Sequence, residues 1–383
     1  MSRVLFTSNP GLGHVHPMVP LARALAGRGH EVRWAVAADA CPRVEAAGFA
    51  PFAAGIAGAE RRSEFDRCLA GTASLPPDRR PDRMFPAFFG EVCTPPMLDD
   101  LLRVVDSWQP ALVVNDASEL AAPLVAHLRG VPHVTHAFGA LLPEPRVAAA
   151  ADAVAPLWRA HGLEPRPYAG CYDHPYLDIY PPSMRSGSYD HVPQVQPLRP
   201  VPFDAVGEDL AEPVVAGARP LVYVTFGTVF NDPGLFSATM AVVADLDVDV
   251  LVTVGPAADP AALGAAPVNV RVERYVPQTA VLPHCSVVVS HAGSGTFLAS
   301  MGLGIPQLCL PQAADQFINA TQGAASGAAL TLAPADASAD AIADAIGRLL
   351  REPAFAHAAG RVREEIAGMP GPDDVAVVLE GLC

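Results

Sequence analysis

Residues 4–37 read VLFTSNPGLGHVHPMVPLARALAGRGHEVRWAVA and combine the signals of a strand, a helix and a second strand. The apolar run at 4–8 stops at a cluster of turn formers, as a buried strand does when it enters a glycine loop. Apolar residues then repeat at helical spacing from Pro17 until Gly29, and 31–37 form the second apolar run. This order predicts a βαβ unit with parallel strands.

The same alternation continues, and it predicts an α/β fold whose parallel sheets are covered by helices on both faces. In the first half we expect helices at 97–108 and 117–129 and strands at 111–115 and 133–136. The second half opens with an apolar run at 221–226 and predicts further strands at 250–254, 268–272, 287–290 and 307–310. Two proline- and aromatic-rich stretches, about 55–95 and 140–195, lack the pattern, so we expect irregular binding loops or lids there.

A proline-rich passage between Pro193 and Pro220 separates the two halves. We therefore predict one α/β domain at 1–198, a linker at 199–219 and a second α/β domain at 220–383, with a ligand cleft between the domains.

Composition restricts the class of protein. The 383 residues, 51% of them hydrophobic, supply enough apolar material for two cores. The net charge of -15 argues against a nucleic-acid partner. Seven scattered cysteines without C-x-x-C spacing argue against a disulfide framework or a zinc ribbon. Since neither a signal peptide nor an apolar stretch of about 18 residues is present, we expect a cytoplasmic protein without stable membrane insertion.

A second glycine turn, Ser290-His291-Ala292-Gly293-Ser294-Gly295-Thr296, follows an apolar strand and precedes a helical run. Small residues at a helix N-terminus suit a diphosphate, because backbone N–H groups and the helix dipole both face the anion. The alternative is an ordinary turn in which Ser294 caps the helix. A Walker A loop and a complete Rossmann fingerprint are both missing, which disfavours ATP and NAD.

An aspartate cluster at 245–249, DLDVD, resembles a metal-binding D-x-D motif. It precedes its predicted strand, whereas ligands of open α/β sheets bind beyond the carboxyl ends of strands. We interpret it as a solvated connection and predict no metal.

His14 follows the first strand and its glycine turn, where an open sheet presents side chains to a ligand. A neutral imidazole can take a proton from an acceptor hydroxyl, and a nearby carboxylate would stabilise the imidazolium formed. Asp116 ends another predicted strand, so it should emerge at the same sheet edge as His14, and it is our candidate for that carboxylate, with Glu119 as runner-up. The alternative for either acid is helix capping.

Four motifs together resemble the UDP-glycosyltransferase superfamily with the GT-B fold, and more narrowly the bacterial antibiotic and polyketide glycosyltransferases that use deoxysugar nucleotides. The motifs are GLGHVHP at 11–17, YVPQ at 275–278, HAGSGT at 291–296 and PQAADQF at 311–317. The resemblance implies an acceptor-binding Rossmann-like domain at 1–198 and a nucleotide-sugar-binding Rossmann-like domain at 220–383, facing across a cleft. It also implies an inverting transfer with His14 as base and Asp116 as its partner. It places Tyr275 and Val276 by the nucleobase, Thr228 and the 291–296 loop at the diphosphate, and Asp315 and Gln316 at sugar hydroxyls. The nucleotide-sugar site then comprises Gly13, Thr228, Tyr275, Val276, Gln278, His291, Gly293, Ser294, Gly295, Thr296, Asp315 and Gln316.

The implied hexosyltransferase needs no cofactor or metal. It takes a TDP- or UDP-linked sugar and a small hydrophobic aglycone, such as an aromatic polyketide. The resemblance does not decide whether the base is uracil or thymine, or whether the product is an O- or a C-glycoside. It also does not decide between a monomer and a homodimer. Three alternatives also remain, namely a sugar-nucleotide epimerase, a catalytically silent partner of another glycosyltransferase, and a plain binder of apolar metabolites.

Overall fold

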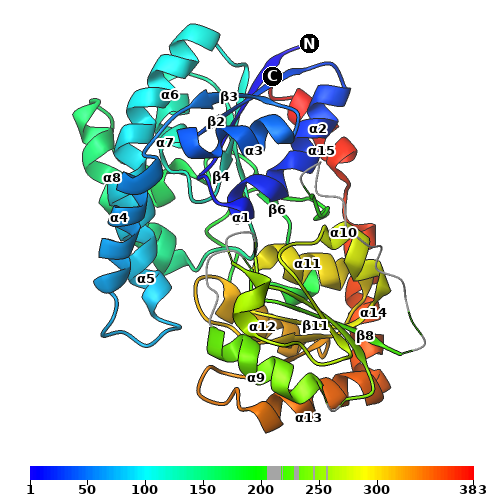
Figure 1. The fold of residues 1–383 in the computed structure, drawn as a ribbon. Helices are drawn as coiled ribbons and strands as arrows, with labels where there is room; N and C mark the ends of the chain where they lie inside the picture. The colour runs from blue at the N-terminus through cyan, green and yellow to red at the C-terminus, as the bar shows by residue number, and fades with distance from the viewer. Residues whose placement is uncertain (205–216, 218, 228–232, 245, 256–257) are drawn as a thin grey trace. The chain divides into compact units, whose positions relative to one another are not determined.

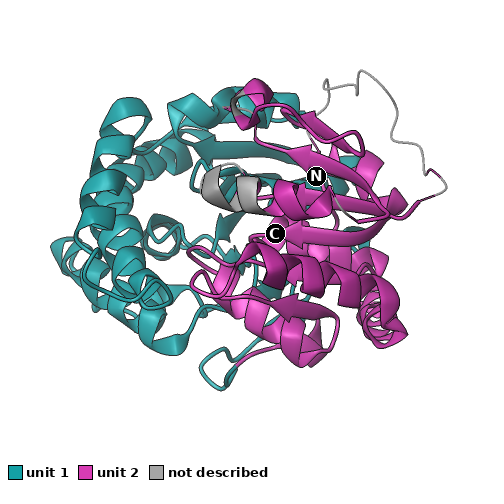
Figure 2. Cartoon of the chain, turned by 60° about the horizontal axis from the view of Figure 1, so that its bottom comes forward, with its two compact units in different colours: residues 1–180, 187–199, 370–383 teal, residues 181–186, 200–369 magenta. Residues whose placement is uncertain are grey.

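The computed structural model describes residues 1–204, 217, 219–227, 233–244, 246–255 and 258–383. They divide into two compact units (Figure 2). Unit 1 comprises 1–180, 187–199 and 370–383, and unit 2 comprises 181–186 and 200–369. Most of the predicted linker lies outside the described residues.

Unit 1 is built on a seven-stranded sheet in the order β3-β2-β1-β4-β5-β6-β7, in which every pair is parallel (Figure 1). The strands are β1 (Arg3–Thr7), β2 (Glu31–Val36), β3 (Ala50–Ala53), β4 (Leu112–Asp116), β5 (His133–His136), β6 (Tyr176–Asp178) and β7 (Val195–Pro197). All five residues of β4 are buried, as expected for a strand covered on both faces. The predicted parallel sheet of the first half is thus confirmed.

The helices of unit 1 differ from the prediction at several of their starts, such as α7, which begins at Ala121 instead of 117, and in the two stretches predicted to be irregular. They are α1 (Leu12–Val15), α2 (Val19–Gly27), α3 (Cys41–Ala46), α4 (Gly58–Ala70), α5 (Arg80–Phe85), α6 (Thr94–Trp108), α7 (Ala121–Arg129), α8 (Glu144–Ala160) and α15 (Pro372–Glu380). The glycine turn leads directly into α1 and a 3-10 turn at His16–Met18, so helical structure begins before Pro17.

The prediction of irregular loops at 55–95 and 140–195 was wrong for much of both stretches. The first contains α4, α5 and a π-helix at Pro86–Cys93, and the second contains α8. Prolines that suggested irregular structure lie instead in the first turns of α5, the π-helix and α8, where a missing N–H costs no helical hydrogen bond. In α8 the buried residues Val147, Ala150, Val154 and Trp158 recur at helical spacing.

The last 14 residues of the chain belong to unit 1. Helix α15 packs beside α2 (Figure 1). Its Glu380 accepts hydrogen bonds from Arg28 at 2.8 Å and pairs with His30 Nε2 at 3.0 Å. The predicted boundaries did not separate this segment from 220–383, because its partners are far away in the sequence.

Unit 2 carries a six-stranded parallel sheet in the order β10-β9-β8-β11-β12-β13. Its strands are β8 (Leu221–Thr225), β9 (Asp249–Thr253), β10 (Val270–Glu273), β11 (Cys285–Ser290), β12 (Gln307–Cys309) and β13 (Ala329–Thr331). Its helices are α9 (Pro233–Val243), α10 (Gln278–Val281), α11 (Ser294–Leu303), α12 (Gln316–Ala325), α13 (Ala339–Arg351) and α14 (Pro353–Gly368). The predicted strands are confirmed to within two residues at each end.

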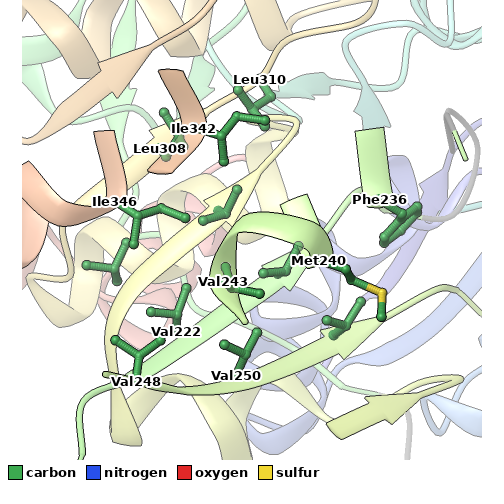
Figure 3. Packing of buried hydrophobic residues seen from close by; sticks show 14 of the residues in the cluster. Val222, Phe236, Met240, Val243, Val248, Val250, Leu308, Leu310, Ile342 and Ile346 are labelled. Atoms are coloured by element: carbon green, nitrogen blue, oxygen red, sulfur yellow. The ribbon is translucent and has the colours of Figure 1, made fainter. Parts of the chain in front are cut away.

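Alternate residues of β8 point into two different cores, which shows that helices cover both faces of this sheet. Val222 and Val224 join a cluster with α9 and α13 residues such as Met240 and Ile342 (Figure 3). Leu221 and Tyr223 join a second cluster. All seven cysteines lie within the described residues, and none of them forms a disulfide. Among the described helices, none has both the length and the apolarity needed to cross a membrane.

Candidate functional site

His14 and Asp116 meet at the carboxyl edge of the unit 1 sheet. Strands β1 and β4 are parallel neighbours with Thr7 opposite Asn115, so they end at the same edge. Asp116 is the last residue of β4, and the turn after β1 leads into α1, which carries His14. The distance from His14 Nδ1 to Asp116 Oδ2 is 2.9 Å. The sequence-based pairing therefore has the expected geometry.

Asp116 holds a negative charge although it is completely buried. Burial alone raises the pKa of its carboxyl, but the electrostatic interaction and hydrogen bond with His14, together with hydrogen bonds from Ser118, outweigh burial and place that pKa below its ordinary value. The His14 side chain is 19% exposed, so it borders solvent while its partner does not. A buried carboxylate on Nδ1 favours the tautomer whose Nε2 is basic.

Two polar residues that the sequence analysis missed complete this network. Ser118 donates through N–H to Asp116 Oδ1 at 3.1 Å and through Oγ to Oδ2 at 2.7 Å, and its Oγ lies 3.1 Å from His14 Nδ1. Asn9 Nδ2 donates to Ser118 Oγ at 2.8 Å and to the Ser118 carbonyl at 3.0 Å. The spacing Asp-x-Ser after a strand is a local turn signal that could have pointed to Ser118.

The imidazole of His14 is enclosed by two aromatic rings and a glycine. Phe89 and Phe138 have ring centroids 5.6 and 4.8 Å from that of His14. Phe89 belongs to the π-helix, whose final turn is supported by a hydrogen bond from Thr94 Oγ1 to the Phe89 carbonyl. A Cβ on Gly11 would lie 2.9 Å from His14 Cδ2, so a side chain there would displace the ring. Apart from Asp116 and Ser118 at Nδ1, the His14 ring thus has apolar neighbours.

Glu119, the runner-up partner, has a different environment. Its Oε2 accepts from Thr7 Oγ1 at 2.7 Å, and its Oε1 accepts from the N–H of Ala121, at the start of α7, at 2.7 Å. Burial raises the pKa of this carboxyl to about 7, with these hydrogen bonds acting in the opposite direction. Its contacts match the alternative of helix capping.

In unit 2, the turn after β11 holds His291 between two glycines. A Cβ on Gly227 or on Gly293 would lie 2.6 or 2.7 Å from His291 Nε2. Burial lowers the pKa of His291 to about 4, so the ring is neutral at pH 7. Within the described residues, His291 Nδ1 has no hydrogen-bond partner.

Helix α11 begins directly after this histidine. Its N-cap is Gly293 without a side-chain cap, so Ser294 is the first helical residue and not the cap considered above. Ala292 adopts φ +63°, a conformation that favours glycine. Thr296 Oγ1 accepts a hydrogen bond from Gln278 Nε2 at 2.8 Å, which ties α11 to α10. The first N–H groups of such a helix are available to an anion.

The predicted sugar-binding residues lie at the start of α12. Asp315 is the N-cap, and its Oδ2 accepts from Ser294 Oγ at 2.5 Å. Gln316 Oε1 accepts from the N–H groups of Gln312 and Ala313 at 2.8 and 2.9 Å, so this side-chain oxygen fixes the preceding loop. The bond between Ser294 and Asp315 therefore joins the start of α11, three residues after His291 in the sequence, to the start of α12.

The remaining residues of the predicted nucleotide-sugar site are not joined to Ser294 and Asp315 by any hydrogen bond described above. Tyr275 OH donates to Asp204 Oδ1 at 3.3 Å. The Val276 side chain is buried in a hydrophobic cluster, which leaves its backbone as the part that could face a base. Gly13 lies in α1 of unit 1, and Thr228 lies outside the described residues.

The aspartate cluster does not gather into a metal site. Asp249 begins β9 and forms an ion pair with Arg219 at the amino end of that strand, while Asp245 lies outside the described residues. In the described part of the chain, no three His, Cys, Asp or Glu side chains are grouped so that they could hold a metal ion. Independence from metal stays a prediction.

Known proteins resemble the chain along its whole length. Family models for the N-terminal and C-terminal domains of erythromycin biosynthesis protein CIII-like proteins match residues 83–206 and 237–382. The elloramycin glycosyltransferase ElmGT of Streptomyces olivaceus is 34% identical over 400 residues, which cover 98% of this chain and 96% of that protein. The L-demethylnoviosyl transferase of Streptomyces niveus is 33% identical over 344 residues, covering 83% and 82%.

A solved structure supports the same relationship. The spinosyn rhamnosyltransferase SpnG superposes with a TM-score of 0.84 and 27% identity, covering 99% of this chain and 100% of that one. SpnG has also been solved in complex with thymidine diphosphate and with the spinosyn aglycone.

Proposed function

Because the chain belongs to the EryCIII-like family of bacterial natural-product glycosyltransferases, we propose that it catalyses an inverting, metal-independent transfer of a deoxysugar from TDP to a hydrophobic aglycone. Its two parallel-sheet units are the Rossmann-like domains of the GT-B fold. The observation that carries the mechanism is the 2.9 Å contact between His14 and the buried Asp116.

His14 is the general base of this mechanism. With Nδ1–H donated to Asp116, its Nε2 takes the proton of the acceptor hydroxyl while the acceptor oxygen attacks the anomeric carbon. The new C–O bond forms as the bond from that carbon to the diphosphate breaks, so a single displacement inverts the configuration. Asp116 stabilises the imidazolium that results. A phenol activated by the same base could attack through a ring carbon, which would give a C-glycoside.

The departing diphosphate is stabilised in unit 2 without a metal. The N-terminus of α11 supplies backbone N–H groups and a partial positive charge, and His291 is a neutral donor beside it. TDP rather than UDP is supported by SpnG, which has been solved with thymidine diphosphate. Asp315 and Gln316 are proposed to bind sugar hydroxyls, and Tyr275 to lie by the base.

The aglycone is proposed to be hydrophobic and flat. The rings of Phe89 and Phe138 flank the base and present apolar surface beside the reacting hydroxyl. An aromatic polyketide fits this environment.

A matched pair of variants tests the proposal. Calorimetric titration of the wild type with TDP and UDP should show tighter binding of TDP. His291→Ala should lose nucleotide affinity, whereas His14→Ala should keep it and lose about 10²-fold in turnover, measured by mass spectrometry with TDP-sugars and aromatic polyketides. A wild type that binds neither nucleotide, or a His14→Ala variant with full turnover, would refute it.

A further inference from the structure

The hydroxyl group of Ser294 is committed to side chains of α12. Ser294 is the first residue of α11 and is 7% exposed. Its Oγ donates to Asp315 Oδ2 at 2.5 Å and accepts from Asn319 Nδ2 at 3.0 Å. A serine hydroxyl carries a single hydrogen. While that hydrogen is given to Asp315, the Ser294 side chain cannot donate it to a diphosphate.

Asn319 ties the same carboxylate to the diphosphate loop. Its Nδ2 lies 3.3 Å from Asp315 Oδ2 and donates to the Ala292 carbonyl at 2.8 Å. The Asn319 side chain is completely buried, which makes an ordered amide of this kind a rigid connector. Ala292 is the loop residue with φ +63°. The side-chain amide of Asn319 therefore contacts both Ala292, in the turn after β11, and Asp315, the N-cap of α12.

These contacts fix one face of the Asp315 carboxylate. Ser294 and Asn319 both reach Oδ2, so a sugar hydroxyl would be bound through Oδ1. The bond from Ser294 is charge-assisted and short, and such bonds are about twice as strong as neutral ones. Without it, the carboxylate could turn about its χ angles toward solvent, because Asp315 is only partly buried.

We infer that Ser294 is a positioning residue that orients Asp315 for the donor sugar, with Asn319 linking this pair to the diphosphate loop. This inference rests on the proposed function, because it takes Asp315 as the residue that binds the sugar. The resemblance placed the whole 291–296 loop at the diphosphate, whereas this inference assigns the Ser294 hydroxyl to Asp315. The sugar pocket and the diphosphate loop then form one connected unit, and Ser294 contributes to the choice of sugar without touching it.

The inference predicts a selective loss in Ser294→Ala. Dissociation constants for TDP and for TDP-α-D-glucose are measured by calorimetry on the full chain. We expect TDP affinity to stay within twofold and the affinity for TDP-α-D-glucose to fall about fivefold to tenfold. Ser294→Thr keeps a hydroxyl and should restore most of the loss. Ser300→Ala is the matched control, since Ser300 is a buried serine of the same helix whose hydroxyl donates to the Thr296 carbonyl at 2.8 Å.

A double-mutant cycle shows whether Ser294 acts through Asp315. If it does, Ser294→Ala should have no further effect on TDP-α-D-glucose binding in an Asp315→Ala background. Thermal melting of each variant checks that it is folded.

Three results would overturn the inference. An equal loss of TDP and TDP-α-D-glucose affinity in Ser294→Ala would make Ser294 a diphosphate ligand. Unchanged binding of both, or additive effects in the cycle, would show that it does not position Asp315. If the wild type binds TDP and Ser294→Ala has the same affinities as the wild type, only this inference is refuted. If the wild type binds neither compound, the proposed function is refuted as well.

Discussion

Replacing Asp116 by asparagine tests the catalytic pair with little change of shape. Oδ1 of Asp116 accepts a hydrogen bond from the backbone N–H of Ser118. The side-chain oxygen of the new asparagine should therefore take the position of Oδ1, and its NH2 group should take the position of Oδ2. Oδ2 now accepts from Ser118 Oγ and lies 2.9 Å from His14 Nδ1. An amide NH2 in that place donates to Nδ1, which moves the imidazole proton to Nε2. The ring then presents an N–H where the mechanism needs a lone pair.

The expected magnitude follows from the contact that is lost. A charge-assisted hydrogen bond contributes about 1.5–3 kcal/mol, and each ~1.4 kcal/mol corresponds to a tenfold change in rate. Loss of the bond alone slows turnover by about 10- to 150-fold, and the tautomer change acts in the same direction. We expect kcat of Asp116→Asn to fall about 10²-fold or more.

Glu119→Gln is the matched control for this experiment. Glu119 is also completely buried and lies only three residues away, but it contacts Thr7 and the start of α7. Its substitution should leave kcat within twofold. Initial rates are measured with saturating donor and acceptor, and TDP affinity is measured by calorimetry for both variants. Wild-type turnover in Asp116→Asn, or an equal fall in both variants, would refute the assignment of Asp116 as the partner of His14.

Three further predictions concern packing, pH and metal. Gly11→Ala should lower kcat about tenfold with unchanged TDP affinity, because its Cβ would lie 2.9 Å from His14 Cδ2; steady-state kinetics that match the wild type would contradict this. The folded pKa of Glu119, about 7, exceeds its ordinary value of 4.5, so the stability it contributes is complete below pH 4.5 and is lost as the pH rises to 7. In urea unfolding, the free energy of unfolding of the wild type should fall by on the order of 3 kcal/mol relative to that of Glu119→Gln over that range. Free energies of unfolding that change in parallel with pH in the two proteins would contradict a raised pKa of Glu119. EDTA should leave activity unchanged, whereas inhibition that magnesium reverses would restore the aspartates near Asp247 as metal ligands.

The sequence was sufficient for most strands of the two sheets and for a common edge of the main pair, but β3, β6, β7 and β13 were not predicted. Short apolar runs bounded by turn formers located β1, β4, β8 and β11 to within two residues. Since β1 and β4 are parallel neighbours, residues that follow them in sequence had to meet at one edge. The sequence thus predicted that His14 and Asp116 emerge at the same edge of a sheet, and the direct adjacency of β1 and β4, which brings them to 2.9 Å, is seen in the structure.

The sequence did not predict contacts that come from helices in stretches expected to be irregular, or from residues far apart in the chain. The ring of Phe89 reaches His14 from a π-helix, and nothing in the local periodicity distinguishes such a helix from a loop. Ser118 and Asn319 each act through several hydrogen bonds of one residue, and such contacts leave no repeating pattern in a sequence. The return of α15 to unit 1 depends on Glu380, whose partners Arg28 and His30 lie some 350 residues earlier.

The contrast between Asp116 and Glu119 shows why burial alone could not identify the partner of the base. Both side chains are completely buried near the same edge of one sheet, so desolvation raises the pKa of each carboxyl. Asp116 faces the His14 imidazole and several hydrogen-bond donors, which reverse the shift, whereas the hydrogen bonds to Glu119 do not. At neutral pH the charged carboxylate is thereby kept beside His14, and Glu119 remains partly protonated. Stabilisation of the imidazolium therefore depends on Asp116, and a change in the charge of Glu119 affects folding more than catalysis.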